Sequence, residues 1–118
     1  MRSHEQKERC EMLRIYPITV ETMRELRPFI ERIERKDGDL CRQMRKAASS
    51  VVLNMSEGMG SRGKLRQVRY HTALGSARET LACLEVAQAF SGWSAHPEVD
   101  ADIRARLDRI IGTLVRLV

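Results

Sequence analysis

Residues 40–58 read LCRQMRKAASSVVLNMSEG, and the spacing of apolar residues in this stretch decides the fold class. Positions 40, 44, 47, 51, 54 and 58 follow one another in steps of four, three, four, three and four. Such steps are typical of a helix that buries one stripe against neighbouring helices. The stretch therefore predicts a helix whose buried stripe contains a single polar residue, Asn54.

The N-terminal region predicts a charged arm followed by a first helix. Residues 1–17 are mostly charged, and we assign them to an arm outside a single bundle domain of residues 18–118. Apolar side chains then repeat on one helical stripe over residues 23–33. Pro28 lies inside that stripe. Because a proline in mid-helix removes a hydrogen bond, we expect this helix to kink or restart near residues 24–27.

The region after residue 58 predicts two further helices. The helix expected over residues 64–90 carries two apolar stripes about 140° apart, so we expect it to be covered on more than one side. One stripe comprises residues 65, 68, 72, 75, 79, 82 and 86, and the other comprises residues 70, 74, 77, 81 and 84. A last stripe occupies residues 103–117. Since short loops make consecutive helices antiparallel neighbours, the sequence predicts an all-α, up-down-up-down four-helix bundle.

Composition excludes several other classes of protein. The length of 118 residues fits one domain, and the low aromatic content of 4% leaves few of the residues that strands prefer. The three cysteines are an odd number without a close pair, which argues against a disulfide framework and favours a reducing cytoplasm. No apolar run approaches the roughly 20 residues of a membrane span. We expect a cytoplasmic protein with no cofactor and no membrane partner.

Positive charge is concentrated in the middle of the chain. The formal net charge is +5, but residues 42–69 hold seven cations against one acid, Glu57. The predicted nucleic-acid-binding residues are these cations: Arg42, Arg45, Lys46, Arg62, Lys64, Arg66 and Arg69. Phosphate contact is one interpretation and a solvated surface is the other. Because no aromatic residues are interleaved with the cations, any binding is expected to be directed at the backbone.

Polar residues on the predicted stripes also admit two interpretations. Glu79 shares a stripe with Gly75, so we expect its carboxylate to point inward, with Gly75 allowing a neighbouring helix to approach closely. Glu57 and Glu79 could form a paired-carboxylate metal site, or Asn54 and Glu57 could belong to a hydrogen-bonded network that fixes helix register. The sequence lacks the Glu-x-x-His pairs of di-metal bundles and any nucleophile motif or phosphate loop. We therefore favour the structural network and predict neither a catalytic nor a metal site.

Three short motifs resemble a known family. They read QMRKAASSV at residues 43–51, NMSEG at residues 54–58 and ALGSARE at residues 73–79. In this order and spacing they resemble the four-helix bundle family of 23S rRNA intervening-sequence proteins, which includes the accessory variability protein of diversity-generating retroelements. The resemblance marks six residues as family motif: Asn54, Glu57, Gly58, Gly75, Ser76 and Glu79.

The resemblance also implies an assembly and partners. It implies a homo-oligomeric, pentameric ring or barrel that binds RNA or DNA and a reverse transcriptase. Five chains would carry a charge of about +25, and many weak phosphate contacts would then act together. Two hypotheses follow. The first is a non-catalytic, homo-oligomeric nucleic-acid-binding protein that is accessory to a reverse transcriptase. The alternative is a protein-interaction scaffold that does not itself bind nucleic acid.

Overall fold

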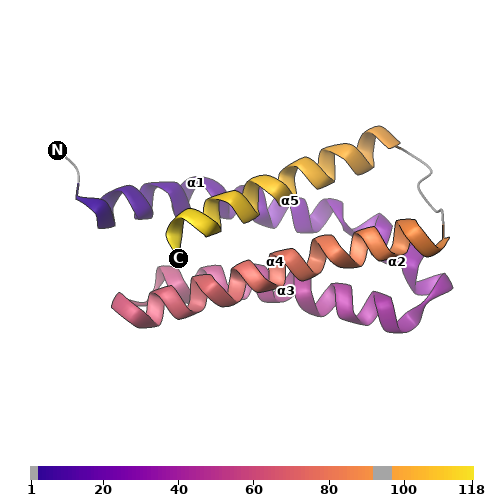
Figure 1. Cartoon of the computed structure of the whole chain (residues 1–118), viewed down its shortest axis with the longest axis horizontal. Coiled ribbons are helices and arrows are strands. Elements are labelled where there is room, and N and C mark those ends of the chain that lie inside the picture. Colours follow the sequence, from indigo (N-terminus) through magenta and orange to yellow (C-terminus); the bar gives the residue numbers. More distant parts are fainter. Residues whose placement is uncertain (1–2, 92–96) are drawn as a thin grey trace.

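The computed structural model of the chain describes residues 3–91 and 97–118, and this part of the chain is helical without strands (Figure 1). The molecule measures 49 × 26 × 19 Å along its principal axes. Its helices are α1 (His4–Glu25), α2 (Arg27–Lys36), α3 (Gly38–Met59), α4 (Gly63–Ser91) and α5 (Pro97–Leu117). The all-α prediction is confirmed.

The helices form four legs, because α1 and α2 follow one another along the same side of the molecule (Figure 1). Consecutive legs run in opposite directions: α1 with α2, then α3, then α4, then α5. Helix α3 packs against α2 and α4, and α5 packs against α4 and α1, so the legs surround one core. None of the described helices combines the length and the apolar composition that a membrane span requires.

Helix α1 begins much earlier than the sequence predicted. The hydroxyl of Ser3 accepts a hydrogen bond from the Gln6 backbone N–H at 3.2 Å, and the Gln6 side chain accepts one from the Ser3 N–H at 3.0 Å. This reciprocal pair starts the helix at His4. The side chains of Met12 and Ile15 are then buried in the core. Residues expected to form an arm thus supply part of the bundle.

The reason for this difference is the use of threonine on a buried stripe. Met12, Ile15, Thr19 and Thr22 are spaced by three, four and three residues, and both threonines are fully buried. The Thr19 hydroxyl donates to the Ile15 carbonyl at 2.8 Å, and the Thr22 hydroxyl donates to the Ile18 carbonyl at 2.7 Å. Because backbone carbonyls of the same helix accept hydrogen bonds from both hydroxyls, these polar residues can be buried on a stripe that is otherwise apolar.

The break in the first leg lies where the proline predicted it. Leu26 forms a turn between α1 and α2, and its side chain is fully buried. Pro28 stands in the first turn of α2, where a backbone N–H would have no partner within the helix. The expected restart near residues 24–27 is therefore confirmed.

The core comes from the predicted stripes of α3 and α5 and from one of the two stripes of α4. On α4 the inner stripe faces the other helices, and Tyr70, Leu74, Ala77 and Leu84 on it are buried. The other stripe, from Leu65 to Val86, is exposed along its whole length. The expectation that α4 is covered on more than one side is therefore wrong for the single chain.

Candidate nucleic-acid interface

The seven predicted cations fall into two groups, one in the first half of α3 and one after its last residue. Three of them, Arg42, Arg45 and Lys46, lie in its first half, and the other four follow its last residue, Met59. At 1.5 Å per residue, about 25 Å of helix separates Arg42 from Met59. The chain therefore presents two separate basic regions instead of one continuous patch.

The cations in the first half of α3 mostly have acidic partners. Arg42 lies 3.0 Å from the carboxylate of Asp39, and Arg45 lies 3.2 Å from that of Glu34 on α2. Lys46 is exposed and makes no ion pair within the described residues. Exposed ion pairs contribute little to stability, so these arginines can exchange a carboxylate for a phosphate at small cost.

The turn between α3 and α4 carries two cations without acidic partners. Arg62 and Lys64 are exposed, and neither makes an ion pair with any residue that the structure describes. We call these two residues the turn cations. Gly63 stands between them with φ of +57°, a left-handed conformation that favours glycine, and starts α4. The first turn of α4 has no acidic side chain. Because a helix N-terminus favours anions, its dipole adds to the charge of the turn cations.

Arg66 has a different role from the turn cations. Its side chain is only 13% exposed, and its Nε donates to the carbonyl oxygens of Gly58 at 3.2 Å and Ser61 at 2.9 Å. Its Nη1 lies 3.5 Å from the carboxylate of Glu5 on α1. The last carbonyls of a helix have no partners within that helix, and this guanidinium supplies one at the end of α3. Arg66 thus holds three segments of the fold together.

Arg69 joins α4 to α3 through an ion pair with Glu57. The two side chains lie 3.0 Å apart and are 41% and 56% exposed. Glu57 is thus paired with Arg69 at the surface. Among the described residues, no side-chain hydrogen bond joins Glu57 to a network with Asn54.

A polar network does join α3 and α4, but through Ser50. The Asn54 side-chain amide donates to the Ser50 carbonyl at 2.9 Å and to the Ser50 hydroxyl at 3.0 Å. The Ser76 hydroxyl, from α4, donates to the Ser50 hydroxyl at 2.7 Å. Asn54 and Ser76 therefore act as a structural pair. Ser50, which was not among the predicted site residues, links the two. The spacing of four residues between Ser50 and Asn54, which places them on one face of a helix, is the sequence feature that indicates this contact.

The two motif glycines occupy opposite environments. A Cβ atom on Gly58 would lie 2.3 Å from Cε1 of Tyr70, so a glycine at this position lets the aromatic ring pack directly on α3. A Cβ atom on Gly75 would meet nothing within 4 Å. The expectation that Gly75 permits close approach is wrong within the single chain.

Glu79 lies on the exposed face of α4 and does not point inward as expected. Ten residues of α4, about 15 Å, separate it from Arg69, the partner of Glu57. The structure therefore does not bring the two carboxylates of the metal hypothesis together. Among residues 3–91 and 97–118, no cluster of three His, Cys, Asp or Glu side chains could hold a metal ion.

Comparison with known proteins identifies the family. The family model described as 23S rRNA-intervening sequence protein matches residues 11–115, and the chain belongs to this family. No curated protein and no solved structure matches the chain.

Proposed function

We propose that this member of the 23S rRNA-intervening sequence protein family is a non-catalytic, homo-oligomeric protein that binds RNA or DNA through the phosphate backbone. The observation that carries the proposal is the turn between α3 and α4. There, Arg62 and Lys64 have no acidic partner within the described residues and flank a helix N-terminus that has no acidic side chain in its first turn. The family description is consistent with a role connected with nucleic acid.

The arrangement favours contact with phosphates over reading of bases. The turn cations are long, exposed side chains. The first backbone N–H groups of α4 have no partners within the helix and can donate hydrogen bonds to a phosphate bound beside them. The ring of Tyr70, which lines the hollow that contains Lys64, is buried and presents no open face on which a row of bases could stack. Binding of this kind releases counterions and weakens steeply as the salt concentration rises.

The exposed stripe of α4 supports self-association. Leu65 is 55% exposed and Val68 is 58% exposed, and Val68 lines a shallow hollow together with Val118 at the end of the chain. Apolar residues gathered on one face indicate an interaction surface. We place contacts between copies on this face, in a pentameric ring that repeats the turn cations. A reverse transcriptase is the protein partner that we propose for the assembled ring.

Binding to nucleic acid is tested by fluorescence anisotropy with a labelled single-stranded RNA, over a series from about 50 to 200 mM salt. The double variant Arg62→Gln/Lys64→Gln should bind roughly tenfold more weakly, and the slope of log affinity against log salt should become shallower by about 1.4, because each phosphate contact on a single strand contributes about 0.7. The matched control is Arg24→Gln/Arg27→Gln, which changes the net charge equally at two exposed ion pairs elsewhere. Absence of binding at low salt, or equal losses in both variants, would overturn the proposal.

Self-association is tested by light scattering on the intact chain. We expect the wild type to be a multimer and Val68→Glu to be smaller, because a charge would be buried between copies. Leu53→Glu is the control, since Leu53 is 61% exposed on α3. A monomeric wild type would contradict the ring. A multimer that binds no RNA would instead favour the scaffold hypothesis.

A further inference from the structure

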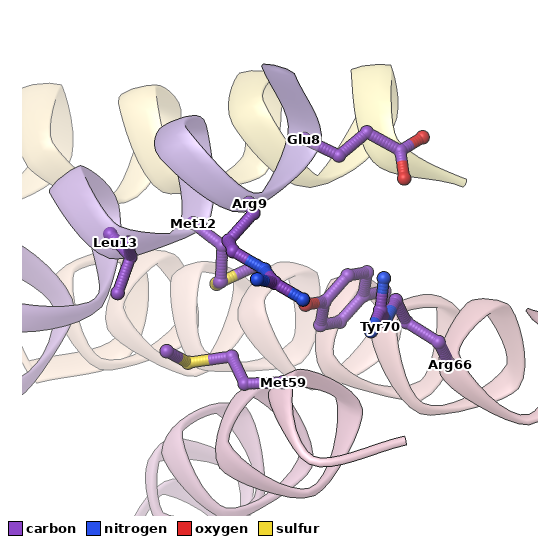
Figure 2. Close-up of a pocket in the computed structure, with 7 residues that line it drawn as sticks. All are labelled: Glu8, Arg9, Met12, Leu13, Met59, Arg66 and Tyr70. Carbon is purple, nitrogen blue, oxygen red and sulfur yellow. The ribbon is translucent and has the colours of Figure 1, made fainter. Parts of the chain in front are cut away.

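A pocket of about 200 Å³ opens beside the turn between α3 and α4. Figure 2 shows Met12 from α1, Met59 at the end of α3 and Tyr70 from α4 around it, with Arg9 also at its wall. Leu13, on its rim, is 56% exposed. The pocket is therefore accessible from solvent and has mainly apolar walls with polar groups at its edge.

The hydroxyl of Tyr70, which lines this pocket, has no hydrogen-bond partner among the described residues. The ring of Tyr70 is buried against Gly58, and its hydroxyl reaches the pocket, where no described group hydrogen-bonds it. Burial raises the pKa of Tyr70, the positive charge of Arg66 lowers it less, and the carboxylate of Glu8 raises it further. The hydroxyl is thus protonated at neutral pH and can donate a hydrogen bond to a ligand.

The pocket adjoins the proposed path of the phosphate backbone. Glu8, Arg66 and Tyr70 line both this pocket and a neighbouring hollow, which also contains Glu5 and Lys64, one of the turn cations. A strand whose phosphate lies at Lys64 would therefore place the attached nucleoside close to the pocket.

We infer that the pocket receives one unpaired nucleobase from a single strand held at the turn cations. This inference rests on the proposed function and adds a base-binding site to it. A cavity of about 150 Å³ can hold one benzene ring, so a pocket of 200 Å³ suits a single small planar ring system.

The chemistry of the walls favours a base over a phosphate. The thioethers of Met12 and Met59 are polarisable and make favourable contacts with aromatic rings. The guanidinium of Arg9 offers a plane for stacking, and unpaired bases of RNA are commonly bound in this way. Glu8 also lines the pocket, and its carboxylate lies 2.9 Å from His4. Figure 2 shows this carboxylate pointing away from the sulfur atoms and from the ring of Tyr70, so the apolar part of the pocket can face a neutral base.

The test compares a single-stranded RNA with an abasic ribose-phosphate strand of the same length, both by anisotropy at the same low salt. We expect the abasic strand to bind about tenfold more weakly, the effect of losing one stacked base. A 2-aminopurine base in the RNA should also become protected from a soluble quencher when the protein binds. Equal binding of the two strands would overturn the base pocket while leaving the proposed function intact. If neither strand binds, the proposed function itself fails.

Two variants localise the effect to the pocket. Met59→Trp should fill it and make the RNA bind as weakly as the abasic strand, whereas Leu53→Trp on the exposed side of α3 should change nothing. Tyr70→Phe removes only the hydroxyl, so it tests the pocket independently if Met59→Trp disturbs folding. It should weaken RNA binding and leave abasic binding unchanged. Retention of the full RNA preference by both variants would contradict the inference.

Discussion

Helix α4 carries two stripes with the same helical repeat, and the chain buries only one of them. The inner stripe contains Tyr70 and Leu84, which are 3% and 0% exposed, whereas Leu65 and Val68 on the outer stripe are more than half exposed. Both stripes are mostly apolar or small, so hydrophobic spacing predicts that each should be covered. Hydrophobic spacing therefore identifies a face suited to packing but does not identify what packs on it.

The largest expected difference between the stripes is the cost of removing a leucine. Leu84→Ala should lower the free energy of unfolding by about 2–5 kcal/mol, because it leaves a cavity in the core. Leu65→Ala, the matched change on the outer stripe, should alter it by no more than about 0.5 kcal/mol. Urea denaturation measures both changes in the free energy of unfolding. It is carried out in a Val68→Glu background, in which we expect self-association to be lost. Similar costs at the two sites would show that the outer stripe packs within the chain.

The next effect concerns the glycine on which the inner stripe packs. Gly58→Ala places a methyl group against the ring of Tyr70 and should destabilise the fold by about 1–3 kcal/mol. Thermal unfolding followed by circular dichroism measures the loss. If the contact with the ring is the cause, the cost should shrink in a Tyr70→Leu background. An unchanged cost there would assign the effect to the backbone of α3.

The glycine of the outer stripe should respond in the opposite direction. Gly75→Ala meets no atom within 4 Å and replaces a poor helix former, so it should stabilise the isolated chain by about 0.5–1 kcal/mol. Denaturation in the Val68→Glu background measures this gain. In the wild-type background, a lower multimer mass for Gly75→Ala would show that copies meet at this position. An unchanged mass would place the contact elsewhere on the face.

The smallest expected effect is on the pH dependence of stability, through Tyr70 on the inner stripe. Burial raises the pKa of Tyr70 above its ordinary value of 10.0, so the folded chain keeps this proton when the unfolded chain loses it. Its contribution to stability is complete below pH 10 and is lost as the pH rises through the raised value. Tyr70→Phe should therefore lose less stability than the wild type between neutral and alkaline pH. Parallel losses in urea titrations of the two proteins would contradict this.

The candidate interface was only partly predictable from the sequence. Its location in a basic segment after α3 follows from the positions of the arginines and lysines. However, Arg62 and Arg66 are one helical turn apart and look equivalent in the sequence, although one is exposed and the other binds the carbonyls of Gly58 and Ser61. The difference depends on where the end of α3 lies relative to α4, which is a tertiary relation.

Local sequence features specify that the described part of the chain is helical, that the first leg breaks at Pro28, and which stripes of α3 and α5 form the core. These features depend on local spacing and backbone chemistry, which act within a few residues. Tertiary packing is what buries Met12 and Ile15, leaves Glu79 facing solvent, and brings the Tyr70 hydroxyl to a pocket near Lys64. Those features depend on which neighbouring helix each helix face packs against, and this packing involves residues that are far apart in the sequence.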